Sequence, residues 1–152
     1  MFQTMNHSLL IFLSFAVGVL VVIQGSMNAR LGVLLSNPLL ATAVALSMGA
    51  ALTLAAVAIT VKHYPTLQQV DDVPFYYWFV GGALSVFGIT LFYYVIPRIG
   101  ISTTVTFGLT GQLLFAAIAG HYGWFGMPAE PISINKAIGM VTVLAGAILI
   151  RS

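Results

Sequence analysis

Five long runs of apolar residues, almost free of charge, constrain this chain more than any other feature. Only 5% of the residues are charged and 60% are hydrophobic, whereas a soluble domain carries about 25% charged residues. A helix needs about 20 apolar residues to cross a hydrocarbon core of about 30 Å. The sequence therefore predicts an all-α integral membrane protein with five transmembrane helices, which at 152 residues form a single domain.

The limits of the apolar runs set the limits of the predicted transmembrane helices. These helices cover residues 8–35, 39–61, 75–96, 101–119 and 134–150. The first run lacks the basic start and the small-x-small cleavage site of a signal peptide. We therefore expect it to be retained as a helix.

The short polar segments between the spans contain residues that are suited to begin a helix. Asn37 is expected to cap the second span, with Pro38 in its first turn, where a missing N–H costs nothing. Asp72 and Ser133 are expected to cap the third and the fifth span. The segment 97–100, with the sequence Pro-Arg-Ile-Gly, predicts a tight turn between the third and fourth spans.

The connections between the spans alternate between longer polar loops and tight turns. Counting the spans places the N-terminus and the loops 62–74 and 120–133 on one side of the membrane, which we name side A. The turns 36–38 and 97–100 and the C-terminus then lie on the opposite side, which we name side B.

The positive charges give this topology almost no preferred orientation, because orientation follows the Lys and Arg count of short loops. Side A carries Lys62 and Lys136, and side B carries Arg30, Arg98 and Arg151. Two interpretations stay open. The chain inserts with side B inside, or it inserts both ways and two opposed copies form an inverted pair, an arrangement known from transporters with inverted repeats.

Several kinds of chemistry are excluded by what the spans lack. No span has an ionisable residue near its middle, so we find no proton carrier and no general acid or base. There are no cysteines, no phosphate-binding glycine loop and no nucleophile beside a base. We expect no enzyme activity and no cofactor.

The histidines of the loops and the net charge of the chain indicate which classes of binding partner are not expected. His7, His63 and His121 map to side A but lack the spacing of metal ligands, so no metal site is expected. A net charge of +2 is too sparse for a nucleic-acid surface. The expected partners are membrane lipid, a small-molecule substrate and a second membrane chain.

Neutral polar residues in the first span share one helix face. Gln24 and Asn28 are four residues apart, and Gly18, Gly25 and Gly32 recur every seven residues. Buried amides are costly in lipid unless they are paired. They form interhelical hydrogen bonds worth about 1 kcal/mol, or they line a substrate cavity, and both alternatives stay open.

The third and fourth spans add to this pattern. Thr104, Gly108 and Gln112 follow at intervals of four residues. A Thr hydroxyl can bond to its own helix, whereas an amide in mid-span needs an outside partner. Tyr93 lies deeper than the aromatic residues of the interface and is suited to stack on a cationic or aromatic ligand. The predicted substrate-binding residues are Gln24, Asn28, Tyr93, Thr104 and Gln112. The predicted helix-packing residues are Gly18, Gly25, Gly32, Gly81, Gly82, Gly88, Gly108, Gly111, Gly139 and Gly146.

Several segments of the chain, taken in order, carry a family resemblance. The segments are Gln24–Gly32 with Asn37-Pro38, Gly81-Gly82, Pro97–Gly100, Thr110-Gly111-Gln112, Tyr122–Pro128, and Pro131–Ser133 with Gly139 and Gly146. Their order and spacing resemble the small five-helix branch of the drug/metabolite transporter superfamily, the YdcZ type. The resemblance covers nearly the whole chain, although no single motif is specific.

The resemblance implies one half of a ten-helix transporter, because related larger members look like two such halves fused in opposite orientation. It also implies dual topology or pairing with an oppositely oriented paralogue. By position, the Gln–Asn pattern of the family falls on Gln24 and Asn28, and its Gly-Gln step on Gly111 and Gln112. Relatives carry an Asp late in the fourth span, where this chain has Gly120-His121. If that Asp serves ion coupling, this chain either lacks coupling or uses His121 instead.

Together these observations predict a secondary transporter, an exporter or exchanger, of a small polar or weakly cationic molecule. It would work by alternating access as an inverted homodimer in the bacterial inner (plasma) membrane, which the chain crosses several times. Gln112→Ala is expected to abolish transport and leave dimerisation intact. The alternative is a small membrane subunit that does not transport but packs against a partner protein or binds lipid.

Overall fold

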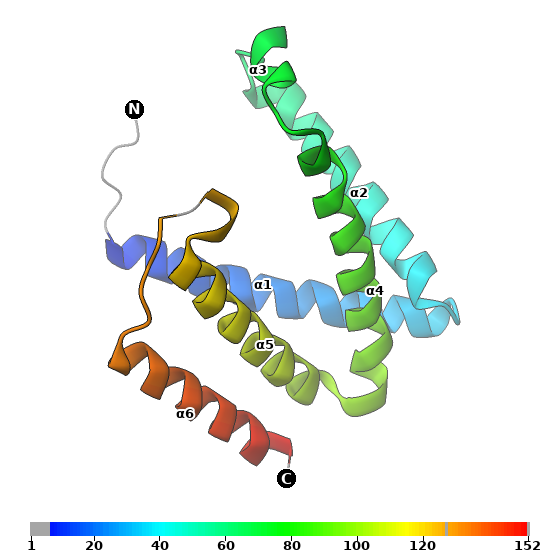
Figure 1. Ribbon diagram of the computed structural model, residues 1–152. Coiled ribbons are helices and arrows are strands. Elements are labelled where there is room, and N and C mark those ends of the chain that lie inside the picture. Colours follow the sequence, from blue (N-terminus) through cyan, green and yellow to red (C-terminus); the bar gives the residue numbers. More distant parts are fainter. Residues whose placement is uncertain (1–6, 127, 152) are drawn as a thin grey trace. The chain divides into compact units, whose positions relative to one another are not determined.

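The computed structural model describes residues 7–126 and 128–151, and every regular element in this part of the chain is helical (Figure 1). This result confirms the all-α prediction. The long helices are α1 (His7–Leu34), α2 (Pro38–Thr60), α4 (Val80–Ile99), α5 (Ile101–Tyr122) and α6 (Ile134–Arg151). The short elements are α3 (Leu67–Asp71) and the 3-10 helices η1 (Phe75–Trp78) and η2 (Trp124–Gly126).

Four described segments are long and apolar enough to cross a membrane, and they match the first four predicted spans. They are His7–Leu34, Pro38–Thr60, Phe75–Ile99 and Ile101–Tyr122. The fifth predicted span, 134–150, corresponds to a shorter apolar helix. Many large apolar side chains on these helices are exposed in the single chain, for example Phe15 at 72% and Leu54 at 68%. Such a surface suits lipid or a partner helix and does not suit water.

The helices fall into two compact units, which are described separately. The first unit holds α1 to α4 up to Arg98, and the second begins at Ile99 and holds α5 and α6. The single membrane domain over residues 1–152 stays a prediction. Ser152 and Met127 lie outside the described residues.

In the first unit, the connection between α1 and α2 is built as the sequence predicts. The Asn37 side-chain oxygen accepts the Leu39 N–H at 2.9 Å, and Pro38 occupies the first turn of α2. Close packing holds the two helices together at this turn. A Cβ placed on Gly32 would lie only 3.2 Å from the Pro38 Cα, and Ala41 is fully buried.

The loop 62–74 differs from the prediction, because it contains the short helix α3. Thr66 and Gln69 form a capping box at its start: each side chain accepts a hydrogen bond from the backbone N–H of the other, at 3.3 and 2.9 Å. Asp72 ends α3, and its N–H donates to the Gln68 carbonyl. Asp72 is therefore not the N-cap of the third span, which begins as η1 after Pro74 without a side-chain cap.

The predicted tight turn at 97–100 is also corrected, because α4 continues through Pro97 to Ile99. Pro97 lacks an N–H, but near the end of a helix this removes only one hydrogen bond. The chain turns at Gly100, whose φ of +84° and ψ of 158° define a conformation open almost only to glycine.

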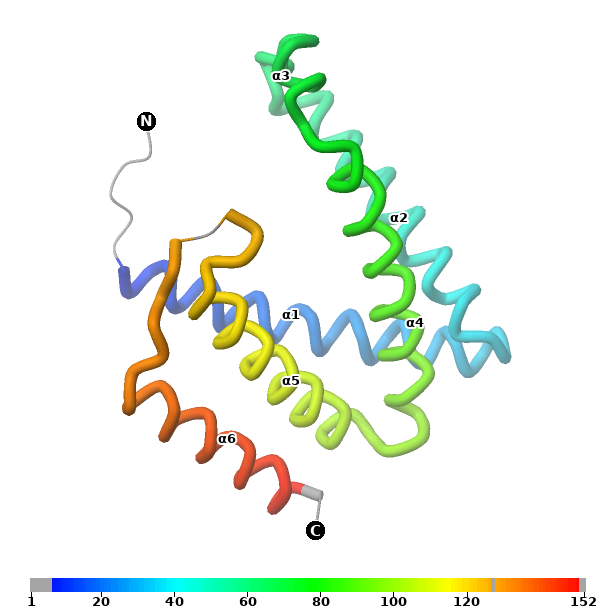
Figure 2. Tube along the Cα trace, in the orientation of Figure 1, coloured from blue at the N-terminus to red at the C-terminus, as the bar shows by residue number. Residues whose placement is uncertain are grey.

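In the second unit, α5 and α6 run side by side (Figure 2). Gly123 ends α5 in the left-handed conformation with a φ of +62°. Ser133 caps α6 as predicted, because its hydroxyl oxygen accepts the Lys136 N–H at 3.2 Å. Lys136 also forms an ion pair with Glu130, with Nζ and Oε2 2.8 Å apart.

Candidate functional site

Two of the predicted substrate-binding residues meet in the first unit. The Asn28 side-chain amide on α1 donates a hydrogen bond of 2.9 Å to the Tyr93 hydroxyl on α4. Tyr93 is only 2% exposed and Asn28 is half-buried. The contact therefore joins two polar groups from distant parts of the chain inside an otherwise apolar helix pair.

A second polar contact lies on the same face of α4, three residues before Tyr93. The Thr90 hydroxyl donates to the Thr42 hydroxyl oxygen on α2 at 2.9 Å. Thr42 is 1% exposed and donates in turn to the Pro38 carbonyl at 3.0 Å. Residues three apart on a helix are neighbours, so Asn28, Thr42, Thr90 and Tyr93 form a polar seam that joins α4 to both α1 and α2.

Thr42 and Thr90 are not among the site residues predicted from the sequence. An isolated Thr in an apolar helix satisfies its hydroxyl by bonding to the carbonyl four residues earlier. Thr60 does so with the Ala56 carbonyl at 2.7 Å, and so does Thr142 with the Ile138 carbonyl at 2.9 Å. Nothing in the sequence separates these residues from Thr42 and Thr90.

Small residues on α1 bring the helices close enough for the seam to form. Gly25, Ala29 and Gly32 are the buried residues of α1, at intervals of four and three residues. A Cβ on Gly25 would collide with the ring of Phe92, which neighbours Tyr93. The predicted packing role of this glycine face explains how Asn28 reaches Tyr93.

On α1 and α2 the seam lies nearer to the side B end of the helix than to its middle, whereas on α4 Thr90 lies at the middle and Tyr93 lies about one turn beyond it toward side B. Counted at 1.5 Å per residue, Asn28 and Tyr93 are each about 9 Å from the ends of α1 and α4, and Thr42 is about 6 Å from the start of α2. An inverted pair is expected to have its binding site at the midplane. The polar contacts of the first unit are therefore displaced toward side B.

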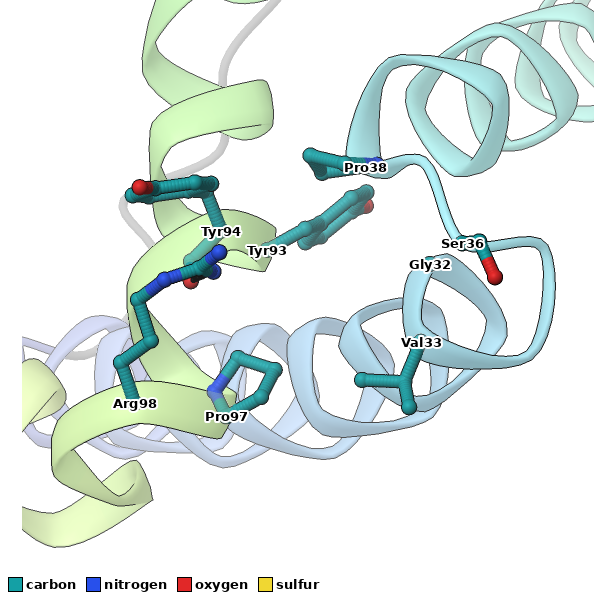
Figure 3. Close-up of a pocket in the computed structure, with 8 residues that line it drawn as sticks. All are labelled: Gly32, Val33, Ser36, Pro38, Tyr93, Tyr94, Pro97 and Arg98. Atoms are coloured by element: carbon teal, nitrogen blue, oxygen red, sulfur yellow. Dashed lines mark hydrogen bonds between the residues drawn. The ribbon is translucent and has the colours of Figure 1, made fainter.

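A cavity of about 180 Å³ opens beside the seam. Its lining residues are Gly32, Val33, Ser36, Pro38, Tyr93, Tyr94, Pro97 and Arg98 (Figure 3). The Arg98 guanidinium carbon lies 3.4 Å from the centre of the Tyr94 ring, and Arg98 also donates a hydrogen bond to the Tyr94 carbonyl. Figure 3 shows Arg98 next to the ring of Tyr94 and Tyr93 close to Pro38.

The other three predicted site residues are Gln24 in the first unit and Thr104 and Gln112 in the second unit. Gln24 lies exposed on α1, one turn before Asn28. Thr104 and Gln112 lie on α5 in the second unit. The Thr104 hydroxyl donates to the Gly100 carbonyl at 2.7 Å, and Gln112 is exposed. A substrate-binding role for these three residues stays a prediction.

Most of the predicted packing glycines face open space within the described chain. Gly25 and Gly32 have close neighbours, as given above. A Cβ would meet nothing within 4 Å at Gly18, Gly81, Gly82, Gly88, Gly108, Gly111, Gly139 and Gly146. Their packing role stays a prediction, and a partner helix or lipid is what would contact them.

The titratable residues of the loops take part in local contacts. The His121 ring nitrogen Nδ1 accepts the Ile132 N–H at 3.3 Å. The hydrogen bond from Lys136, and then its charge, hold the pKa of Glu130 below its usual value. Among residues 7–126 and 128–151, no three His, Cys, Asp or Glu side chains gather in a way that could hold a metal ion.

Apolar helices of membrane-spanning length, joined by a neutral polar seam, define a multi-pass helical membrane protein. The chain belongs to the family described as "Putative inner membrane exporter, YdcZ", whose model matches residues 9–149. This match confirms the predicted YdcZ-type membership and the multi-pass location in the inner membrane. No curated protein and no solved structure matches the chain.

The family description also bears on function. The description names export across the inner membrane, which is consistent with the predicted transport. An exporter is a transporter and not an enzyme. The prediction that the chain is not an enzyme is therefore confirmed. The substrate, dual topology, dimerisation and the wider superfamily stay predictions.

Proposed function

We propose that the chain is a secondary transporter that exports or exchanges a small polar or weakly cationic molecule. Two oppositely oriented copies form the working unit and operate by alternating access. The observation that supports this most directly is the hydrogen bond between Asn28 and Tyr93. It places an amide and a phenol together within segments that are otherwise apolar and of spanning length.

The chemistry of the seam favours a substrate that exchanges hydrogen bonds. Among the described residues, the bond to Tyr93 uses one of the two N–H donors of Asn28 and leaves its carbonyl oxygen free to accept another. Within the described residues, the Tyr93 hydroxyl accepts from Asn28 and keeps its own O–H to donate to a substrate. A substrate that replaces the Asn28–Tyr93 bond with its own polar groups would loosen α1 from α4, which couples binding to helix movement.

The small number of spanning helices around the seam favours a dimer as the transporting unit. The first unit offers three spanning helices around the seam, with exposed apolar side chains on the outside. Inverted repeats in transporters place their binding site where the repeats meet. A second copy in the opposite orientation would supply the repeat that one chain lacks.

A second candidate function is a subunit that does not transport. It is favoured by the eight predicted packing glycines that face open space, because small residues allow close approach of a partner helix. This partner would be a different membrane protein, and the chain would be expected to co-purify with it.

Reconstitution of the purified protein into liposomes separates the two candidates. The probes are radiolabelled nicotinamide, a neutral amide, and histamine, a weakly basic amine, with protein-free liposomes as the control. We expect uptake of at least one probe to exceed the control. Liposomes that take up neither probe faster than the control, together with a second protein that co-purifies, would favour the subunit.

A further inference from the structure

The cavity at the side B end of the first unit carries a cation for which the structure offers no counter-charge. No carboxylate of the described residues lies within salt-bridge distance of Arg98. The first 98 residues contain only two acids, Asp71 and Asp72. Both lie in the connection between α2 and α4, at the opposite ends of these helices.

The Arg98 guanidinium is held in place although it lacks an acidic partner. It stacks on the Tyr94 ring, and it donates one hydrogen bond to the Tyr94 carbonyl. An Arg side chain has five N–H donors, so most of them remain for a ligand. A stacked, pre-oriented guanidinium suits the paired oxygens of a phosphate.

The start of α2 adds positive potential on another wall of the cavity. Pro38, the first residue of α2, lines the cavity together with Arg98. The N-terminal end of a helix carries the positive end of its dipole and favours anions nearby. The C-terminal ends of α1 and α4 also reach this cavity and oppose the dipole of α2, so the full positive charge of Arg98 provides the attraction for an anion.

The size of the cavity limits what it can hold. Its volume of about 180 Å³ corresponds to roughly six water molecules at about 30 Å³ each. Pockets for whole drug-sized ligands start at about 300 Å³. The cavity can therefore take an anionic group such as a phosphate, while the rest of the ligand stays outside.

The surroundings of the cavity favour a lipid as the source of that group. The cavity lies where α1 ends, α2 begins and α4 approaches its end. Because these ends bound the apolar spans, we expect the cavity at the level of the membrane interface. Apolar side chains beside it are exposed, with Val33 at 46% and Leu34 at 66%. Acyl chains can pack along this surface while the phosphate reaches Arg98.

We propose that the cavity between α1, α2 and α4 binds the phosphate of a membrane phospholipid, which is held by Arg98. The cation at this position makes the cavity a poor site for a weakly cationic substrate, so we assign the cavity to lipid, although its wall shares Tyr93 with the polar seam. The proposal does not depend on the proposed function, because a transporter and a subunit would both contact lipid here.

Native mass spectrometry of the purified protein, titrated with didecanoyl phosphatidylglycerol, tests the proposal by counting bound lipid. Arg98→Gln is expected to weaken binding about tenfold or more, as loss of a charge-assisted hydrogen bond predicts. Arg30→Gln is the matched control, because Arg30 is an exposed cation on α1 that does not line the cavity. Equal binding by the wild type and Arg98→Gln would overturn the proposal.

A second variant and two further probes cover the other outcomes. Val33→Phe should fill the cavity and reduce binding although Arg98 is kept, so the test stands even if Arg98→Gln does not fold. Didecanoylglycerol, which has the same acyl chains but no phosphate, is expected to bind at least tenfold more weakly than the phospholipid. If it binds equally, or if equimolar inorganic phosphate displaces the phospholipid, the site does not recognise a lipid phosphate.

Discussion

Asn28 and Tyr93 place two hydrogen-bonding groups in helices that lipid surrounds. A hydrogen bond between helices in a membrane contributes about 0.6 kcal/mol on average and rarely more than about 1.7. If the Asn28–Tyr93 hydrogen bond only joins the two helices, its loss lowers the free energy of unfolding by about 0.6 to 1.7 kcal/mol. If it contacts substrate, transport falls by much more than the stability change explains.

The residue-level test compares transport with stability in the same variants. Asn28→Ala and Tyr93→Phe are each expected to lower transport about tenfold or more, because one hydrogen bond to the substrate is lost. Each is expected to lower the free energy of unfolding in detergent by only about 1 kcal/mol. Ser85→Ala is the control, because the Ser85 hydroxyl is exposed and bonds within α4 to the Gly81 carbonyl at 2.9 Å. Variants that transport as well as this control would show that the pair serves only to hold the helices together.

The second prediction at the residue scale concerns the substitution of Gly25. A Cβ there would collide with Phe92, so Gly25→Ala should lower the free energy of unfolding by about 1 to 3 kcal/mol, the usual cost of overpacking. Phe92→Leu should relieve part of this cost in the double variant. Gly49→Ala on α2 is the control, because its Cβ would meet nothing within 4 Å. Chemical unfolding in micelles measures all three, and equal effects at the two glycines would disprove the contact.

At the scale of the elements, the ion pair between Glu130 and Lys136 ties the connection before α6 to its first turn. The hydrogen bond from Lys136, and then its charge, lower the pKa of Glu130 from its usual 4.5. The stability that this pair contributes is present above the usual pKa and is lost as the pH falls through the lowered value. Both side chains are more than a third exposed, so we expect a small effect.

The pKa of Glu130 can be measured directly, because it is the only Glu in the sequence. Protein labelled with ¹³C at the Glu side-chain carboxyl should give one carbon signal that titrates below pH 4.5. Lys136→Gln should move that titration upward, toward the usual value. A midpoint at or above 4.5 in the wild type, or one that does not respond to Lys136→Gln, would contradict the ion pair.

Local signals explain which helix limits can be predicted from the sequence. Asn37 and Ser133 act as caps as expected, because capping depends on the few residues around the helix start. Asp72 was wrongly expected to cap the third span, because the capping box of Thr66 creates α3, which ends there. Pro97 lies within α4, because one lost hydrogen bond near a helix end is tolerated.

The site can be predicted only in part from the sequence. Asn28 and Tyr93 stand out as polar groups in apolar spans, but helical periodicity gives no information about which distant side chain each will contact. Thr42 and Thr90 resemble every other hydroxyl that bonds to its own helix. Their pairing depends on how α2 and α4 pack, which is a property of tertiary structure.

At the scale of the whole molecule, the proposed transporter needs two copies in opposite orientations. The nearly equal distribution of positive charge, with Lys62 and Lys136 on side A and Arg30, Arg98 and Arg151 on side B, gives little preference for either orientation. The open glycine faces leave room for a partner helix. Both observations are expected of a chain that forms an inverted pair.

The orientation of the C-terminus tests this claim most directly. The chain has no cysteine, so Ser152→Cys provides a single site for labelling with a membrane-impermeant maleimide, first in intact cells and then after permeabilisation. For an inverted homodimer we expect about half of the molecules to be labelled only after permeabilisation, because the C-terminus lies on both sides of the membrane. Complete labelling in intact cells, or complete protection, would show one orientation and contradict the inverted homodimer.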